Sequence, residues 1–245
     1  MSLIRSVLHM LWMVVTVIPY TFGVLLAKWT SGSSGKAYRV ARAWLKLSVD
    51  SARVLMGIQY RVQGMDNLPT DGQGVVLLVK HQSTYETFLM PSIMPRPLAY
   101  VFKKELLKVP FFGWSIGALD MIHIDRAQGS RAFHKVVEQG KRLLDQGIWV
   151  IMFPEGTRVN RGEVGDYKTG ATRLAIMTGA SVVPVAVTSA KCWPRKAFIK
   201  KPGVVDVSIG KPISSVGRKH DELMAEVQAW IESEMQRLDP EAYRK

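Results

Sequence analysis

The chain has 245 residues, of which 47% are hydrophobic, so it can bury one substantial core. It carries 33 Lys and Arg against 20 Asp and Glu, and its net charge of +13 favours polyanionic partners such as anionic lipids, phosphorylated substrates or nucleic acid. The single cysteine, Cys192, excludes an intrachain disulfide and a cysteine-built metal site.

The N-terminal segment from residue 7 to residue 27 contains no Asp, Glu, Lys or Arg. As a helix it is roughly 31 Å long, which matches the hydrocarbon core of a bilayer. Pro19 in its middle predicts a kink or a break, so a straight span and a helix that enters and leaves one leaflet are both open. A cleaved signal peptide and a buried core helix are the alternatives to this membrane anchor.

The cationic residues around this segment predict its orientation. Only Arg5 precedes it, whereas several cations follow it, namely Lys28, Lys36, Arg39, Arg42 and Lys46. By the positive-inside rule, the body of the protein lies on the cytoplasmic side of the inner membrane. Residues 30–35 (TSGSSG) predict a linker, and residues 40–58 predict an amphipathic helix at the interface. We therefore expect a membrane-anchoring helical segment at 1–58 and a catalytic domain at 59–245.

Short β-rich runs alternate with helical patterns through the rest of the chain, at residues 74–79, 98–102, 121–124, 148–153, 181–187 and 204–209. This alternation predicts an α/β fold with a mostly parallel sheet flanked by helices. Two covering helices are expected, from about Ser130 to Gly147 and from Asp221 to Leu238. In such sheets the chemistry lies where strands end and helices begin.

A histidine and a carboxylate follow the first predicted strand, at His81 and Glu86. On an ideal helix five residues correspond to about 140°, so the two side chains meet only if His81 lies in the turn before the helix. A carboxylate on one imidazole nitrogen leaves the other nitrogen free to take a proton from a hydroxyl. Taken alone this spacing is not specific, because structural pairs share it.

Four blocks occur in order between residues 75 and 190: residues 80–86 (KHQSTYE), residues 104–106 with 110–114 and 124–126, residues 153–158 (FPEGTR) and residues 182–185 (VVPV). Together they resemble the glycerolipid acyltransferase family, whose typical members are lysophosphatidic acid acyltransferases of the bacterial PlsC type. The resemblance implies transfer of a fatty acyl group from acyl carrier protein or coenzyme A to the sn-2 hydroxyl of 1-acyl-sn-glycerol 3-phosphate (lysophosphatidic acid). The product is then phosphatidic acid.

The resemblance also implies roles for individual residues. His81 is the general base, and Glu86 replaces the usual Asp as its partner. The phosphate and glycerol of the substrate are assigned to Lys104, Arg126, Glu155, Gly156, Thr157 and Arg158. Guanidinium groups suit this role because their forked donors match phosphate oxygens. Because lipid A acyltransferases also resemble H-x₄-E, another lysolipid acceptor stays open.

The mechanism expected from these residues is direct attack on the thioester, with His81 as base. Backbone amides after the strand, or a lysine, are expected to stabilise the oxyanion. Ser83 is the candidate for an acyl-serine route, but no second activating partner is evident. We expect no cofactor beyond the thioester co-substrate, and no metal, because no His, Cys, Asp and Glu residues show ligand spacing.

Two other classes of protein compete with this interpretation. A nucleic-acid-binding protein would explain the net charge, but no recognised motif for nucleic acid is present. A non-catalytic membrane-anchored interaction protein is distinguished by whether it consumes acyl thioester. The basic run at residues 191–201 is either a solvated loop or a second contact with anionic membrane lipids.

Overall fold

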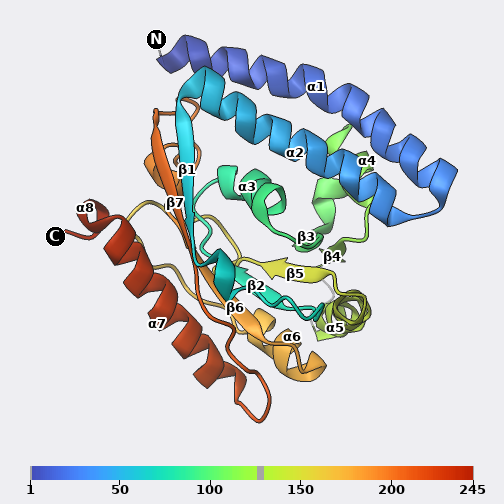
Figure 1. Cartoon of the computed structure of the whole chain (residues 1–245), viewed down its shortest axis with the longest axis vertical. Helices are drawn as coiled ribbons and strands as arrows, with labels where there is room; N and C mark the ends of the chain where they lie inside the picture. The colour runs from blue at the N-terminus through green and yellow to red at the C-terminus, as the bar shows by residue number, and fades with distance from the viewer. Residues whose placement is uncertain (1, 126–129, 245) are drawn as a thin grey trace.

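The computed structural model describes residues 2–125 and 130–244, and it is built around a seven-stranded sheet (Figure 1). The strands lie in the order β1-β7-β6-β2-β5-β3-β4. Their bounds are β1 (Ile58–Gln63), β2 (Val76–Val79), β3 (Leu98–Lys103), β4 (Ile122–Ile124), β5 (Trp149–Met152), β6 (Val182–Val187) and β7 (Gly203–Ile209). Among these strands only the β6–β7 pair is antiparallel. The predicted α/β fold with a mostly parallel sheet is confirmed.

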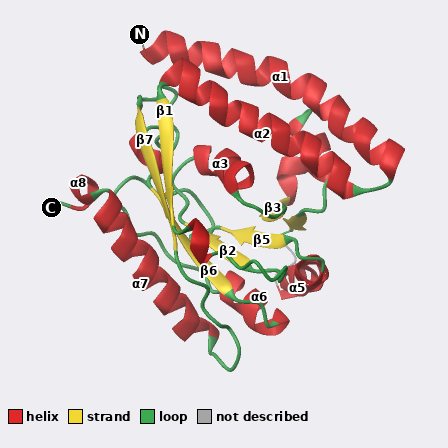
Figure 2. Cartoon of the chain, viewed as in Figure 1, coloured by secondary structure: helices red, strands yellow, loops and turns green. Residues whose placement is uncertain are grey.

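Helices cover both faces of the sheet (Figure 2). They are α1 (Ser2–Ser31), α2 (Ser34–Met56), α3 (Tyr85–Ile93), α4 (Phe112–Gly117), α5 (Ser130–Asp145), α6 (Gly170–Thr178), α7 (His220–Leu238) and α8 (Pro240–Tyr243). Short 3₁₀ turns add η1 (Met65–Asn67), η2 (Lys104–Lys108) and η4 (Ser189–Lys191). Leu77 and Val79 of β2 face a core shared with α2 and α3, whereas Val76 and Leu78 face one shared with α5, α6 and α7.

The six predicted strands are all present, with ends shifted by at most two residues. Strand β1 was not predicted, and residues 40–58 were expected to be helical to their end. Helix α2 instead ends at Met56, where Gly57 adopts a left-handed conformation with φ of 70°. The N–H of Gly57 donates to the carbonyl oxygen of Arg53 at 3.1 Å, which is a common helix ending. The chain then enters β1 directly and pairs with β7.

Helices α1 and α2 form a hairpin with a very short turn. Only Gly32 and Ser33 lie outside the two helices, so the expected linker at residues 30–35 is mostly helical. Helix α1 also continues through Pro19, so the chain is not broken there. The indole N–H of Trp44 in α2 donates to Thr16 of α1 at 3.1 Å, and this contact holds the helix just before the proline.

Helix α1 buries a mostly polar set of side chains against the protein, namely Ser6, His9 and Thr21 together with Val24. Its opposite side is an exposed apolar surface formed by Leu3, Ile4, Leu8, Leu11, Val14, Val15, Phe22, Leu26 and Trp29. Within the described residues, α1 is the one helix long and apolar enough to cross a membrane. A continuous exposed surface of this kind marks a contact with a membrane or another protein.

The turn after β1 generates a stability prediction. Gly64 has a φ of 79°, and a Cβ there would overlap the carbonyl oxygen of Ile209 at the end of β7. We expect Gly64→Ala to lower the free energy of unfolding by about 2–5 kcal/mol, because left-handed strain adds to the overlap. Urea unfolding in detergent measures this loss.

Gly179→Ala is the matched control, because Gly179 has a φ of 73° but a Cβ there would meet no other atom within 4 Å. Its free energy of unfolding should fall only by the cost of left-handed strain, about 1–2 kcal/mol. Equal losses in the two variants would show that the overlap with β7 has no energetic effect.

Candidate active site

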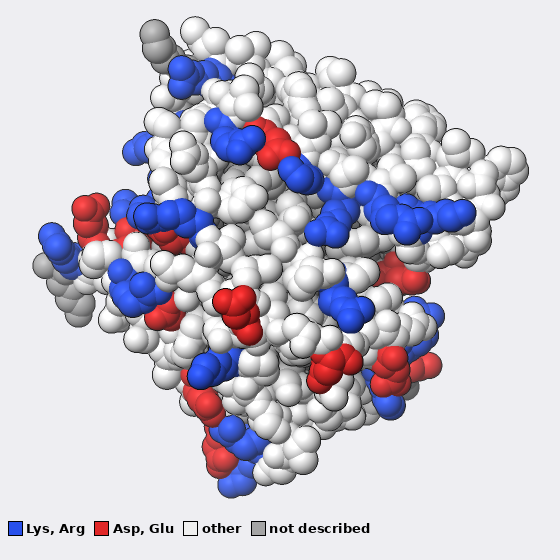
Figure 3. Space-filling view, viewed as in Figure 1, with Lys and Arg blue, Asp and Glu red and all other residues white. Residues whose placement is uncertain are grey.

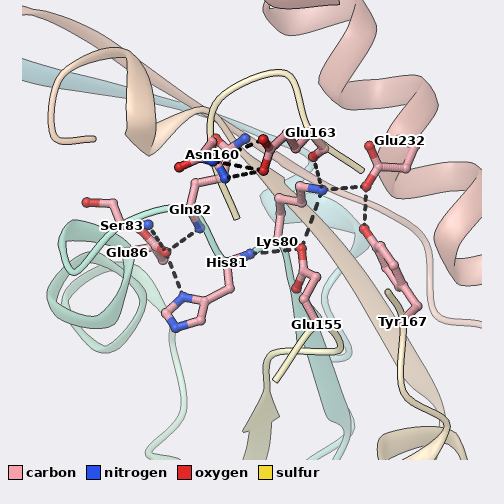
Figure 4. A network of polar contacts seen from close by, with 10 residues as sticks. All are labelled: Lys80, His81, Gln82, Ser83, Glu86, Glu155, Asn160, Glu163, Tyr167 and Glu232. Carbon is pink, nitrogen blue, oxygen red and sulfur yellow. Dashed lines mark hydrogen bonds and ion pairs between the residues drawn. The ribbon is translucent and has the colours of Figure 1, made fainter. Parts of the chain in front are cut away.

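The side chains of His81 and Glu86 meet at the turn between β2 and α3 (Figure 4). His81 Nδ1 lies 2.8 Å from Glu86 Oε1, and Glu86 is in the first turn of α3. The predicted position of His81 in the turn before the helix is therefore confirmed. Because a carboxylate only accepts hydrogen bonds, the proton of neutral His81 is on Nδ1 and Nε2 is the basic nitrogen.

The carboxylate of Glu86 is held by further hydrogen bonds. The same oxygen accepts the backbone N–H of Gln82 at 2.9 Å and that of Ser83 at 2.7 Å. Glu86 is fully buried, and the amino terminus of α3 favours its negative charge. These contacts fix Glu86, and through it the orientation of the imidazole.

The imidazole of His81 is also held by the loop that follows β5. The ring of Phe153 stacks on it, with 3.9 Å between centroids and 15° between planes. The backbone N–H of Val159 donates to the carbonyl oxygen of His81 at 2.8 Å. The side chain of His81 remains 15% exposed, so part of the held ring can reach a substrate.

The first three sequence blocks converge at one edge of the sheet. His81 follows β2, Glu155 follows β5, Lys104 follows β3 and Asp125 follows β4. These four strands are consecutive neighbours and mutually parallel, so their carboxyl ends lie at the same edge. The fourth block is β6, whose Val185 carbonyl oxygen accepts the N–H of Lys80 at 3.0 Å beside the site.

Glu155 is buried, and its Oε1 accepts the backbone N–H of His81 at 3.3 Å. Burial raises the pKa of Glu155, whereas the nearby Lys80 ammonium and the backbone N–H of His81 lower it. Gly156 follows with a φ of 63°, a conformation that glycine adopts without strain. Thr157 is exposed at this turn. Phe153 and Glu155 of the motif thus contact His81 directly.

The candidate phosphate ligands differ in their burial and in their contacts. Arg158 is half-buried, and its Nη1 donates to Thr84 Oγ1 at 2.8 Å, next to the turn that carries His81. Lys104 is exposed, with its Nζ 3.5 Å from Asp125 Oδ2. Arg126 lies outside the described residues, so its role stays a prediction.

Sequence reasoning missed a buried cluster beside His81 (Figure 4). Lys80 is fully buried, and its Nζ donates to Glu232 Oε1 at 2.6 Å and to the carbonyl oxygen of Glu163 at 3.1 Å. The hydroxyl of Tyr167 donates to the same oxygen of Glu232 at 2.7 Å. The only local signal was a lysine directly after an apolar strand.

Two mechanistic expectations change. The amides of Gln82 and Ser83 are bound to Glu86, and that of His81 is bound to Glu155, so these donors cannot form the expected oxyanion site. Ser83 is fully buried, and its hydroxyl accepts the N–H of Tyr85 at 3.0 Å, which disfavours a nucleophilic role. In residues 2–125 and 130–244, no three His, Cys, Asp or Glu residues are grouped to hold a metal ion.

The basic run at residues 191–201 packs on the N-terminal part of α1. Lys200 is largely buried, its Nζ lies 4.8 Å from the centroid of the Trp193 ring, and its backbone N–H donates to Ser6 Oγ at 3.0 Å. Trp193 also contacts the ring of His9 edge-on, at 5.6 Å between centroids. At least these two residues of the run therefore have structural roles.

Comparison with known proteins identifies relatives of this chain. The family model described as Acyltransferase matches residues 59–188. A protein of Pseudomonas aeruginosa named 1-acyl-sn-glycerol-3-phosphate acyltransferase is 39% identical over 204 residues, which are 82% of this chain and 78% of the relative. The mouse protein named 1-acyl-sn-glycerol-3-phosphate acyltransferase alpha is 29% identical over 74% of this chain and 64% of its own length.

A solved structure agrees over almost the whole chain. The crystal structure of the 1-acyl-sn-glycerophosphate acyltransferase PlsC from Thermotoga maritima matches with a TM-score of 0.80 and 25% identity. The match covers 98% of each chain, so it includes the helical hairpin α1–α2 and helix α7 as well as the sheet.

The geometry predicts different consequences for two changes at position 86. Glu86→Gln keeps an acceptor oxygen but removes the charge that stabilises a protonated His81, so we expect kcat for acyl transfer to fall by about 10²–10⁴-fold. Glu86→Asp keeps the charge, and it should retain substantial activity if the turn adjusts by one methylene. Steady-state kinetics below the melting temperature of both variants measures these effects.

Wild-type kinetics in both variants would contradict the pairing of His81 with Glu86. Thermal unfolding serves as the control, because Glu86 also binds two backbone amides whose loss lowers stability.

Proposed function

Because the chain belongs to the acyltransferase family, we propose that it esterifies the sn-2 hydroxyl of 1-acyl-sn-glycerol 3-phosphate with a fatty acyl group from an acyl thioester. The product is phosphatidic acid. The observation that carries this proposal is the buried Glu86 on Nδ1 of His81, which leaves the basic Nε2 for a substrate hydroxyl. The names of the relatives support the choice of acceptor.

His81 acts as a general base in a direct transfer. Its Nε2 takes the proton of the acceptor hydroxyl as that oxygen attacks the thioester carbonyl. The tetrahedral intermediate then collapses, the carbon–sulfur bond breaks, and the imidazolium returns the proton to the leaving thiolate. The charge of Glu86 stabilises the imidazolium during these steps. General-base catalysis of this kind contributes about 10²–10⁴-fold to rate.

The substrate phosphate is bound by cations at the edge of the sheet. Arg158 lies on the loop after β5, Lys104 begins η2 directly after the adjacent β3, and Arg126 follows Asp125 in the sequence. Guanidinium groups bind phosphate oxygens bidentately, and the net charge of +13 favours an anionic substrate. The acyl donor is acyl carrier protein or coenzyme A, both of which present the same thioester.

A different lysolipid acceptor is the second candidate for this site. Glu86 in place of the usual Asp is the specific observation that favours it. The reaction remains acyl transfer to a lipid hydroxyl, and only the bound headgroup differs.

The membrane is bound through α1, which lies in the plane of one leaflet. Helix α1 contacts the protein along its length, through His9, Thr16 and Thr21. Figure 3 shows a row of cationic side chains beside the uncharged surface of α1, and the cations of the adjacent α2 are Lys36, Arg39, Arg42, Lys46 and Arg53. A perpendicular α1 would carry these cations into hydrocarbon, whereas an in-plane α1 leaves them at anionic headgroups. The catalytic domain is on the cytoplasmic side of the inner membrane.

Incubation with defined lipids tests the reaction. Detergent-solubilised protein is mixed with lysophosphatidate, or another lysolipid, and with each acyl thioester, and the product is identified by mass spectrometry. We expect phosphatidic acid, and His81→Ala should lower kcat by about 10²–10⁴-fold without lowering the melting temperature to the assay temperature.

Three results would count against the proposal. Activity of His81→Ala near the wild-type value removes the general-base mechanism. Product from another lysolipid alone reassigns the acceptor. Absence of thioester consumption with every acceptor identifies a non-catalytic interaction protein.

Membrane binding by the exposed side of α1 is tested with Val15→Glu. The side chain of Val15 is exposed in the structure, and its transfer into lipid contributes about 1.5–3 kcal/mol. We expect partitioning onto anionic vesicles to fall about tenfold or more in a sedimentation assay. Val216→Glu, at an exposed valine before α7, is the matched control and should bind like wild type.

A further inference from the structure

Lys80 occupies an unusual position for a lysine, because its side chain is fully buried next to the proposed base. Its Nζ lies 2.6 Å from Glu232 Oε1, 3.1 Å from the carbonyl oxygen of Glu163 and 3.4 Å from Glu155 Oε1 (Figure 4). Two of the three N–H donors of the ammonium are hydrogen-bonded, to Glu232 and to Glu163, and Glu155 is a further ion-pair partner. Because Lys80 is fully buried, it acts through these neighbours and does not face a substrate.

The contacts of Lys80 join three separate parts of the fold. Lys80 is at the end of β2, Glu155 and Glu163 are on the loop after β5, and Glu232 is on α7. Figure 4 shows the side chains of Glu155 and Glu232 pointing towards the Lys80 ammonium from these different elements. Helix α7 packs on the opposite face of the sheet from α3, so the ammonium connects that face with the edge that carries His81.

One atom of this cluster contacts both Lys80 and the base. Glu155 Oε1 is 3.4 Å from the Lys80 ammonium and also accepts the backbone N–H of His81 at 3.3 Å. The same loop supplies the ring of Phe153, which stacks on the imidazole. A displacement of Glu155 would therefore disturb two contacts of His81: the hydrogen bond to its backbone N–H and the stacking of Phe153 on its ring.

The electrostatics make Lys80 necessary for this arrangement. Glu155 and Glu232 bring two carboxyl groups to one ammonium, and the Oε2 atoms of both are buried without a hydrogen-bond partner among the described residues. Buried carboxylates are costly unless a charge compensates them. Lys80 is the cation that lowers the pKa of Glu155, against burial that raises it.

We propose that Lys80 is a positioning residue, which holds His81 and the loop of residues 153–165 in one arrangement, and that Glu232 of α7 is the counter-ion that keeps Lys80 in place. Glu232 lies outside the segment 59–188 that matches the family model. The catalytic arrangement thus extends into the C-terminal helix. The kinetic part of this inference rests on the proposed acyl transfer, whereas the structural part does not.

Neutralising the pair separates positioning from stability. Lys80→Met or Glu232→Gln alone leaves a buried charge without its partner, so each should lower the melting temperature. The double variant Lys80→Met, Glu232→Gln removes both charges of that pair and should regain part of the loss, although Glu155 still lacks its compensating cation. Its kcat should nevertheless stay about 10- to 100-fold below wild type, because small misplacements of a catalytic group are costly.

Asp206→Asn is the matched control variant. Asp206 is a similarly buried carboxylate on β7, with its Oδ1 2.7 Å from Arg61, at the opposite end of the strand order from β3 and β4. Its replacement should lower the melting temperature and leave kcat of the folded enzyme unchanged.

The pH profile gives a second kinetic readout. The titratable groups that interact with Glu155 are Lys80, His81, Tyr167 and Tyr243, with Glu232 in the same cluster. Without the Lys80 charge the pKa of Glu155 rises further, so more of it is protonated at a given pH. The kcat deficit of the double variant should be largest between the two pKa values of Glu155, where the carboxyl is ionised in wild type but protonated in the variant. It should shrink as pH rises above the higher of the two values. A purely structural role would leave the shape of the profile unchanged.

Hydrogen–deuterium exchange tests the same inference without substrate. Peptides that cover residues 80–87 and 153–165 should exchange faster in the double variant than in wild type or Asp206→Asn. Faster exchange in a protein whose wild-type form makes no phosphatidic acid would retain the positioning role and refute only the proposed function. Wild-type exchange, kcat and pH profile in a stable double variant would overturn the positioning role of Lys80.

Discussion

A single carboxylate oxygen, Oε1 of Glu86, holds the turn on which the candidate active site depends. It accepts hydrogen bonds from the imidazole of His81 and from the backbone amides of Gln82 and Ser83. The two amide bonds fix the carboxylate, and the carboxylate fixes the ring. Because Glu86, Gln82 and Ser83 are buried between β2 and α3, the strand, the turn and the helix position the imidazole of His81 as one unit.

Much of the fold could be predicted from local patterns. Each predicted strand was a short apolar run that fills a buried parallel sheet, and β2 is buried at every position. Strand β1 gave no such signal, because most of the side chains in IQYRVQ are exposed at the edge of the sheet. Its pairing with β7 joins residues 145 positions apart, such as Arg61 and Asp206, and local periodicity contains no information on that contact.

The candidate site was predicted in part, for a related reason. Spacing around His81 and Glu86 required a turn, and the structure has that turn. Spacing could not show that the amides of Gln82 and Ser83 are already bound to Glu86, which leaves a lysine as the other expected oxyanion donor. Lys80 and Glu232 are 152 residues apart, and their pairing becomes visible only when α7 is packed on the sheet.

The outward apolar side of α1 has a kinetic consequence. If α1 lies in the plane of one leaflet, as we propose, the chain meets a lysolipid acceptor by lateral diffusion, so encounters depend on the mole fraction of that lipid in the surface rather than on its bulk molarity. A thioester donor dissolved in water would instead follow ordinary molar concentration. The proposed reaction would then couple two phases, and its product would return to the same leaflet without crossing water.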